Sequence, residues 1–314
     1  MVRSLPGDRH RGADSAGQGR LLPAWGTVMP SCFFVSDLHG ATERYQTLFG
    51  LIADERPAAV FLGGDLLPGG LSVGTLDPGH RDFVNSFLVA GFDRLRQALG
   101  DAYPRVFVIL GNDDSRFEEA AFLDAATRGV WHYAHERGLS FGTYDVYGYA
   151  CVPPTPFVNK DWERYDVSRH VEPGCISPEE GSRSVPVAPH LIRYATMLDD
   201  LRTLTAGHDL GQAIMLFHSP PYQTTLDRAA LDGRLVDHVP VDVHVGSIAI
   251  RRFIEQRGPL VTLHGHVHES ARLTGAWSDR IGRTWCFSAA HDGPELALVR
   301  FDPDHPAAAT RMLI

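Results

Sequence analysis

Five apolar runs in this chain each stop at residues that can bind a metal ion. The runs read C-F-F-V-S-D-L-H-G, A-V-F-L-G-G-D, V-F-V-I-L-G-N-D-D, I-M-L-F-H-S-P-P and L-V-T-L-H-G-H-V-H. β-Branched and aromatic runs closed by Gly, Asp or His are typical of buried strands that carry polar side chains at their carboxyl ends. The metal-capable residues at these ends are Asp37, His39, Asp65, Asn112, His218, His266 and His268. We therefore expect an α/β sheet structure whose strand ends share one site.

The types of side chain at these ends indicate which ligand the site would take. In sheets that alternate with helices, ligands bind beyond the carboxyl ends of the strands, where residues distant in sequence meet. Carboxylates, imidazoles and one amide, without a thiolate, suit Mn, Fe or Zn better than an iron–sulfur cluster or Cu(I). Seven ligands exceed what one tetrahedral ion needs. The simplest explanation is a pair of ions roughly 3.5–4 Å apart, as in two-metal phosphoryl transfer.

Helical and strand patterns occupy several segments between and after these runs. Residues 42–55, 81–99 and 114–128 have helical spacing and predict crossover helices of β-α-β units. The second half contains more strand patterns. They predict a hairpin within 140–152 and late antiparallel strands at 285–288 and 296–301.

Length and composition predict one globular domain over residues 29–314. A chain of 314 residues can bury one large core, and its 44% hydrophobic and 21% charged residues are ordinary. No apolar run approaches the ~18 residues that a membrane span needs, so we expect no membrane partner. The net charge of −9 argues against nucleic acid as a general partner, because nucleic-acid-binding domains usually present a basic face.

The cysteines and the first residues bear on where the protein works. Four scattered cysteines without a C-x-x-C motif predict reduced thiols in a cytoplasmic protein. Residues 1–28 are rich in Gly, Arg, Asp and Ser and lack the apolar core of a secretory signal, which predicts a disordered leader. Met29 directly precedes the first strand pattern and is an alternative start of translation.

The motifs of this chain resemble those of the calcineurin-like metallophosphoesterase family in type and in order. The matching strings are D-x-H at 37–39, G-G-D ending at Asp65, G-N-D-D at 111–114, H-S at 218–219 and G-H-x-H at 265–268. Each string alone is a weak signal, but five in the family order, each closing a strand pattern, are specific. The resemblance spans about residues 30–268. It implies a sandwich of two mixed β-sheets flanked by helices, with the metal site at the strand carboxyl ends.

The resemblance also implies a role for each metal-capable residue. The first ion would be held by Asp37, His39 and His268. The second would be held by Asn112, His218 and His266. Asp65 would bridge both ions, because each of its two oxygens can face a different cation. Asn112 would also touch a substrate phosphate through its amide group, which makes it a candidate catalytic residue.

One position departs from the family pattern. The commonest third motif has a His that is thought to act as the general acid, and this chain has Asp113 there. Some similar bacterial members have Cys at that position and remain phosphodiesterases. Asp113 would donate a proton only if burial or the neighbouring Asp114 raised its pKa, whereas two cations would lower it. We therefore expect Asp113 to be ionised or structural, and the leaving group to depend on the metals, water or another His.

Each motif residue, taken singly, has a simpler explanation. Asp37 and Asp65 could be helix N-caps. Gly-Asn-Asp-Asp could be a turn. His218 could end a strand before two prolines, while His266 and His268 could be satisfied core histidines. Agreement of all five strings favours the metal site.

Residues 153–189 have no regular pattern and precede a helix pattern at 192–204. Long loops without secondary structure are usually functional or disordered. Two alternatives stay open: a lid over the metal face that governs substrate choice, or a surface excursion with an aromatic anchor. The candidate substrate contacts are Lys160 and Arg164 in this segment and Arg116 after the G-N-D-D string.

Together these observations predict a dinuclear metal-dependent hydrolase of phosphoric esters. The cofactors would be two divalent or trivalent ions, Mn, Fe or Zn, and the enzyme would most simply be a phosphodiesterase that uses a metal-bridging hydroxide. A phosphomonoesterase or pyrophosphohydrolase of the same fold is the alternative. A non-enzymatic scaffold is disfavoured because all seven ligand types are present, and a nuclease would need a basic groove.

Overall fold

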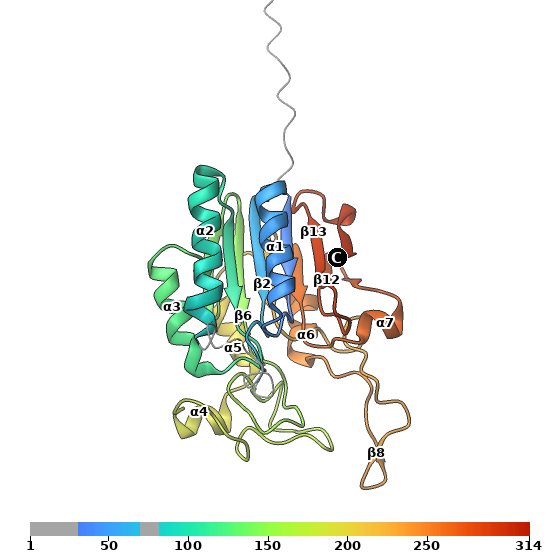
Figure 1. Cartoon of the computed structure of the whole chain (residues 1–314). Helices are drawn as coiled ribbons and strands as arrows, with labels where there is room; N and C mark the ends of the chain where they lie inside the picture. The colour runs from blue at the N-terminus through green and yellow to red at the C-terminus, as the bar shows by residue number, and fades with distance from the viewer. Residues whose placement is uncertain (1–30, 70–81) are drawn as a thin grey trace, which may run out of the picture.

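Two six-stranded sheets form the centre of the molecule in the computed structural model, which describes residues 31–69 and 82–314 (Figure 1). The strands of the first sheet are β1 Cys32–Val35, β2 Ala59–Gly63, β3 Arg105–Ile109, β4 His132–Tyr133, β13 Ala297–Phe301 and β14 Thr310–Leu313. Those of the second are β5 Arg137–Phe141, β6 Tyr144–Tyr149, β7 Ala213–Phe217, β10 Val261–His264, β11 Ser278–Ile281 and β12 Thr284–Ser288. A separate small hairpin contains β8 Leu235–Val236 and β9 Val239–Pro240.

Both sheets are mixed. The first has the order β14-β13-β1-β2-β3-β4. In it β1 to β4 are parallel, β13 is antiparallel to β1, and β14 is antiparallel to β13. The second has the order β11-β12-β10-β7-β6-β5, with β12, β10, β7 and β6 parallel between two antiparallel edges. All residues of β1, β2, β7 and β10 are buried, as continuous apolar strands covered on both faces should be. The predicted two-sheet architecture is confirmed.

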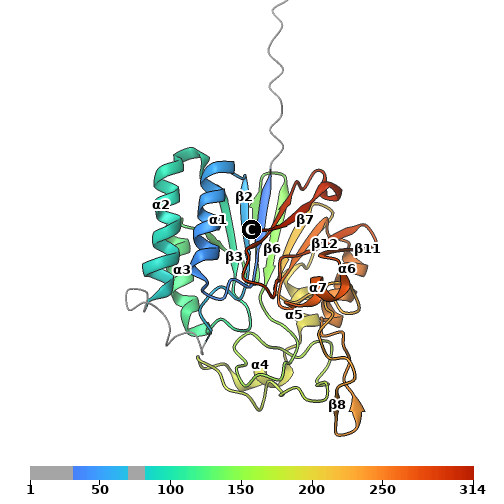
Figure 2. The same ribbon diagram turned by 45° about the vertical axis from the view of Figure 1, so that its right-hand side comes forward.

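The helices lie outside the sheets (Figures 1 and 2). Those beside the first sheet are α1 Thr42–Glu55, the π-helix η3 Val84–Val89 continuing into α2 Ala90–Leu99, and the 3-10 turn η5 Arg116–Glu118 continuing into α3 Glu119–Thr127. The others are α4 Pro189–Tyr194, α5 Met197–Leu204, α6 Ile248–Arg257 and α7 Ser270–Thr274, with short 3-10 turns at Gly100–Ala102 and Pro306–Ala308. In α1 the buried residues Tyr45, Leu48 and Ile52 have the spacing of one helix face, which explains why this segment packs as a helix.

Aromatic rings connect the two sheets in the core. Phe61 of β2 stacks on Phe107 of β3 with ring centroids 5.2 Å apart and also contacts Phe301 of β13. Phe301 in turn lies 6.0 Å from Phe287 of β12, in the second sheet. These contacts fix the position of one sheet on the other.

Several predicted elements are confirmed and others are corrected. Helix α1 has the predicted bounds, and strand β13 pairs antiparallel with β1 and β14. The predicted hairpin is β5–β6, displaced toward residue 137 and turning at Gly142, where φ is +58°. Strand β12 is antiparallel to β11 but parallel to β10.

Two predicted helix bounds are wrong. The helix predicted from residue 114 begins as an α-helix at Glu119, because the Asp114 side chain points back and binds backbone N–H groups of Leu66 and Leu67. The pattern at 192–204 forms two helices, α4 and α5. They are separated because Thr196 caps α5 at the N–H of Asp199. The start of the 81–99 pattern and the leader at 1–28 lie outside the described residues.

Residues 153–188 contain no helix or strand in the described structure and pair only through isolated bridges. Together with the β8–β9 hairpin, this segment projects beyond the carboxyl ends of the central strands (Figures 1 and 2). In the described part of the chain, we find no helix with the length and apolar character required to cross a bilayer.

Candidate metal centre

The five predicted strand ends meet at one edge of the molecule. Asp37 and His39 follow β1, Asp65 follows β2 and Asn112 follows β3. In the second sheet His218 follows β7, and His266 and His268 follow β10. Within each sheet these strands are parallel neighbours, so their carboxyl ends lie side by side.

Four of these residues have a left-handed backbone. The φ angles are +57° at Asp37, +45° at His39, +52° at Asp65 and +74° at His266. Non-glycine residues adopt this conformation at a cost, and they persist in it mainly at functional sites. The sequence gives no direct sign of this strain.

The first cluster contains Asp37, His39, Asp65 and His268, whose ligand atoms all lie within 4.8 Å of one another. The Nε2 atoms of His39 and His268 are 3.1 Å apart, and Nε2 of His268 lies 3.2 Å from Oδ1 of Asp37. Two histidine nitrogens and two carboxylates gathered this closely are the kind of nitrogen and oxygen ligands that a metal cation binds.

The second cluster contains Asp65, His218 and His266. Nε2 of His218 lies 3.2 Å from Oδ2 of Asp65 and 3.1 Å from Oδ1 of Asn112. Asp65 is therefore common to both clusters, since the same Oδ2 lies 3.9 Å from Nε2 of His39. Its other oxygen, Oδ1, accepts the backbone N–H of Asp113 at 2.8 Å. Oδ2 of Asp65 thus lies between the two clusters, whereas the sequence prediction assigns one oxygen to each ion.

Charge is concentrated in this buried site. Burial would raise the pKa of Asp37, but its hydrogen bond with His268 and the charges of His268, His218 and His39 hold it well below its usual range. Burial would lower the pKa of His39, yet the Asp113 hydrogen bond and the charges of Asp65 and Asp37 raise it to about 9. The carboxylates of this site therefore favour protonated histidines, a role that bound cations would take over.

The pKa values of His218 and His266 shift in opposite directions, although both rings lie in the second cluster. Burial would lower the pKa of His218, but the charge and hydrogen bond of Asp65 raise it to about 9. Burial and then the charge of His218 lower the pKa of His266 to about 4. His266 is therefore neutral at neutral pH, the form that binds metals.

Hydrogen bonds from neighbouring groups fix the orientation of the clustered side chains. Nδ1 of His218 donates to the carbonyl of Gly63 at 2.8 Å, which leaves Nε2 toward the cluster. Nδ1 of His39 lies 3.1 Å from Oδ2 of Asp113, which leaves its Nε2 toward the cluster as well. Metal-binding histidines are commonly oriented in this way through the other ring nitrogen.

Two glycines of the motifs, Gly111 and Gly265, lie so close to candidate ligands that a side chain would not fit. A Cβ atom on Gly111 would lie 2.3 Å from Oδ1 of Asp65 and 2.7 Å from Nε2 of His218. A Cβ atom on Gly265 would lie 2.6 Å from Oδ2 of Asp37. Side chains at either position would displace candidate ligands.

Asp114 has a structural role that the sequence did not reveal. It is fully buried and accepts backbone N–H groups from Leu66, Leu67 and Gly111 at 2.8–2.9 Å. Burial and the charge of Asp65 raise its pKa to about 7, although the backbone bonds oppose this shift. Asp114 joins the loop after β2 to the loop after β3. Its place as the second acid of the G-N-D-D string is the one sign of this role in the sequence.

The three candidate substrate contacts are engaged elsewhere. Lys160 is fully buried, and its Nζ donates to Glu163 and to the carbonyl of Thr155, so a substrate phosphate has no access to it. Arg164 pairs with Asp200 at 3.0 Å. Arg116 pairs with Glu119 at 3.2 Å, and its guanidinium lies 4.9 Å from the centre of the Trp162 ring.

Comparisons with known proteins agree with this architecture. A model of the calcineurin-like phosphoesterase family matches residues 31–270. The solved structure of TT1561 from Thermus thermophilus superposes with a TM-score of 0.53 at 18% identity, over 91% of this chain and 99% of that chain. Another solved structure has a TM-score of 0.56 at 16% identity with the same coverage. A dimetal phosphatase from Danio rerio gives a TM-score of 0.46 at 12% identity, over 86% of this chain and 91% of that chain. No curated protein matches the sequence significantly.

Proposed function

Because the chain belongs to the calcineurin-like phosphoesterase family, we propose that it is a dinuclear metal-dependent phosphodiesterase. The observation that carries this proposal is the position of Asp65 Oδ2, which lies within 4 Å of histidine Nε2 atoms from both ligand clusters. One carboxylate shared by two groups of donors is the arrangement that a pair of ions requires.

The residues that would hold the ions are those that the motifs predicted. The first ion would lie among Asp37, His39 and His268, and the second among Asn112, His218 and His266. Asp65 would contact both. Bound ions would supply Lewis acidity, lowering the pKa of water and neutralising charge on the phosphoryl group. Mn, Fe and Zn all suit these nitrogen and oxygen donors.

Asp113 would act on the site through His39. Its carboxylate accepts from Nδ1 of His39, while its own backbone N–H donates to Asp65. Asp113 would thereby hold two candidate ligands in place. We propose that it is a positioning residue and that it is not the general acid.

The three basic residues predicted to contact the substrate already pair with carboxylates, which favours a diester substrate over a monoester. At neutral pH a phosphomonoester carries an additional partial to full negative charge compared with a diester. Arg116, Lys160 and Arg164 each already pair with a carboxylate, so none is an uncommitted partner for that additional charge. A diester needs less compensation from the protein.

The cytoplasmic location remains part of the proposal. Cys151 and Cys286 are buried free thiols, which is consistent with a reducing compartment.

A metal-varied substrate panel tests the proposed function. Metal-depleted protein would be reconstituted with Mn²⁺, Fe²⁺ or Zn²⁺ and assayed with an aryl phosphodiester, an aryl phosphomonoester and pyrophosphate. We expect diester hydrolysis to require two ions per chain and to exceed monoester hydrolysis. Faster turnover of the monoester or of pyrophosphate would favour the alternative enzymes. Two bound ions without hydrolysis of any substrate would favour a non-enzymatic scaffold.

A further inference from the structure

A cavity of about 710 Å³ lies beside the metal centre. Its walls come from residues 153–175, from residues 222–248, and from His266, Val267 and Glu269 after β10. The volume is typical of sites that bind small organic molecules. Because His266 belongs to one ligand cluster, the cavity and the candidate metal centre share a wall.

The lining of the cavity is largely apolar. Its larger apolar side chains include Phe157, Val167, Leu231, Leu235, Val236 and Val241. Phe157 is 62% exposed and Leu235 is 61% exposed, although they come from opposite segments of the wall. Large apolar side chains gathered at a concave surface mark a site that an apolar ligand would cover.

The carboxylates of the lining are already paired within the protein, Glu172 with His170 at 3.3 Å. Asp166 accepts the N–H groups of Ile248 and Ala249 at the start of α6. Asp242 accepts from the Tyr222 hydroxyl, and Glu269 accepts the N–H of Ala230. These carboxylates hold the walls together, and most of the remaining lining is hydrocarbon.

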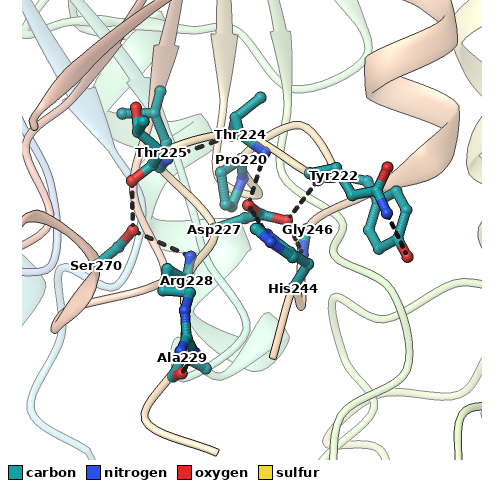
Figure 3. A network of polar contacts seen from close by, with 12 residues as sticks. Pro220, Tyr222, Thr224, Thr225, Asp227, Arg228, Ala229, His244, Gly246 and Ser270 are labelled. Atoms are coloured by element: carbon teal, nitrogen blue, oxygen red, sulfur yellow. Dashed lines mark hydrogen bonds and ion pairs between the residues drawn. The ribbon is translucent and has the colours of Figure 1, made fainter. Parts of the chain in front are cut away.

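A buried carboxylate preforms one wall (Figure 3). Asp227 accepts the N–H groups of Gln223, Thr224 and Gly246 at 2.9–3.2 Å, and Nδ1 of His244 lies 2.8 Å from it. These bonds join the outgoing and returning strands of the excursion that carries β8 and β9. The base of the wall is therefore fixed before any ligand arrives, which lowers the entropic cost of binding.

A second set of bonds anchors the same wall to the segment after β10 (Figure 3). The Ser270 hydroxyl donates to the carbonyl of Thr225 and accepts the N–H of Arg228. Ser270 begins helix α7, two residues after His268. The cavity wall and the metal-site loop thus form one connected unit.

We propose that this cavity binds the organic group of the substrate and that this group is uncharged and apolar, such as an alkyl or fused-ring ester. This inference rests on the proposed phosphodiesterase function. The phosphodiester would lie at the metal centre beyond His266, and its hydrocarbon would fill the space between Phe157 and Leu235.

Charge in the lining disfavours a substrate with further phosphates. In the described chain, the lining contains Arg234 as its single Lys or Arg, against Asp166, Glu172, Asp242 and Glu269. A nucleoside polyphosphate or a nucleic acid would bring additional negative charges toward these carboxylates, and like charges repel. A neutral hydrocarbon avoids that repulsion.

The test uses methyl, butyl and octyl esters of one aryl phosphate, which share a leaving group and differ in chain length. With the metal-loaded wild-type protein, we expect kcat/KM to rise at least about tenfold from methyl to octyl, because each buried methylene adds binding free energy. In Leu235→Asp and Phe157→Asp this dependence on chain length should largely disappear. Both side chains are exposed, so neither substitution disturbs the core.

Leu273→Asp is the matched control. Leu273 is 40% exposed on α7 and does not line the cavity, so this variant should keep the wild-type dependence on chain length. Hydrolysis that is independent of chain length, or that is fastest with a nucleotide diester, would overturn the inference while the proposed function stands.

A binding measurement separates failure of this inference from failure of the proposed function. If metal-loaded protein hydrolyses no ester at all, the proposed function fails. Calorimetric titration with methyl, butyl and octyl phosphonates then tests the cavity alone. Affinity that rises with chain length in wild type and in Leu273→Asp, and does not rise in Leu235→Asp, supports the apolar site. An affinity that does not change with alkyl chain length in the wild type would overturn the proposed apolar site.

Discussion

Asp65 is the residue on which a two-ion site depends most, because its Oδ2 lies 3.9 Å from Nε2 of His39 and 3.2 Å from Nε2 of His218. Asp65→Asn keeps the shape of the side chain and removes its negative charge. We expect fewer than two bound ions per chain and a fall in kcat/KM of more than about 100-fold, since even the partners of metal ligands contribute 10–100-fold. Metal analysis by mass spectrometry together with a diesterase assay measures both effects.

A carboxylate outside the site provides the control for Asp65. Asp101 lies on the surface in the turn after α2, so Asp101→Asn should bind metals and turn over like the wild type. Two bound ions and near-normal turnover in Asp65→Asn would exclude a shared role for this carboxylate.

The role of Asp113 can be separated from general acid catalysis with two substitutions. Asp113→Asn retains an oxygen that can accept from Nδ1 of His39, whereas Asp113→Ala removes it. If Asp113 positions His39, we expect Asp113→Asn to stay within about threefold of wild type and Asp113→Ala to lose about 10–100-fold. The loss should be equal for aryl esters with good and poor leaving groups.

A general acid at Asp113 would give a different result. Both substitutions would then impair esters with poor leaving groups most, and the alkaline limb of the pH–rate profile would disappear in both. A leaving-group series and a pH profile for the two variants therefore decide between the roles.

At the residue scale, the sequence predicted which side chains meet but not what holds them. The structure brings all seven candidate ligands together, since each follows an apolar strand; their role as ligands remains a proposal. Asp114 could not be recognised, because its partners Leu66 and Leu67 lie 48 and 47 positions away in sequence. Lys160 is a candidate substrate contact in the sequence, and its burial against Glu163 follows from tertiary packing that no local pattern records.

At the scale of elements, the sequence located strands and helices better than their ends. The apolar spacing of residues 42–55 predicts α1, and Pro57 after it predicts where the helix ends. The break between α4 and α5 depends on a tertiary contact, because the N–H of Met197 donates to the carbonyl of Tyr165 in the long loop. Bonds of this kind are invisible in a helical pattern.

A buried histidine between two strand ends makes the stability of the second sheet depend on pH. Nδ1 of His135, just before β5, accepts the N–H of Ala150, just after β6, at 3.0 Å. Burial and the charges of Arg116, Arg164 and Arg137 lower the pKa of His135 to about 3. The unfolded chain, with a histidine pKa of about 6.5, therefore binds the proton more readily. Stability due to His135 is present above pH 6.5 and is lost progressively as the pH falls from about 6.5 toward 3.

Urea unfolding of the metal-free protein measures this contribution. Between pH 7 and pH 5 the wild type should lose about 2 kcal/mol of unfolding free energy through His135. His135→Asn can still accept the Ala150 N–H and should lack that loss. His190→Asn, at an exposed position, should keep it. Equal pH dependence in wild type and His135→Asn would exclude the assignment.

At the scale of the whole molecule, residues 153–189 connect the metal-site loops to the cavity. Asp161 accepts the N–H of Arg116, just after the third motif, and the side-chain amide of Asn159 donates to the carbonyl of Asn112 at 3.4 Å. Trp162 is fully buried. These contacts support the proposal that the segment shapes the substrate site, and they show that it cannot be deleted without exposing part of the core.

Metal binding should also depend on pH, because the metal-free site holds protons where cations would lie. Burial would lower the pKa values of His39 and His218, but the nearby carboxylates raise both to about 9. At pH 7 both rings carry protons that metal binding must displace. We therefore expect apparent affinity to rise between pH 6.5 and 8.5, by up to about tenfold per pH unit for each proton displaced, and to level off above about 9.

Calorimetric titration with Mn²⁺ at pH 6.5, 7.5 and 8.5, in buffers of different ionisation enthalpy, gives both the affinity and the number of protons released. At least about two protons should leave per chain at pH 7 when both ions bind. Burial would lower the pKa of His268, but its hydrogen bond with Asp37 raises that pKa too. His170→Asn, at an exposed position outside both clusters, should release the same number. His39→Asn should release about one fewer, because one displaced proton belongs to that ring. An affinity that is constant across this range, with no proton release, would show that the histidines are already neutral in the metal-free protein. Cations would then add to the charge of the site without replacing protons.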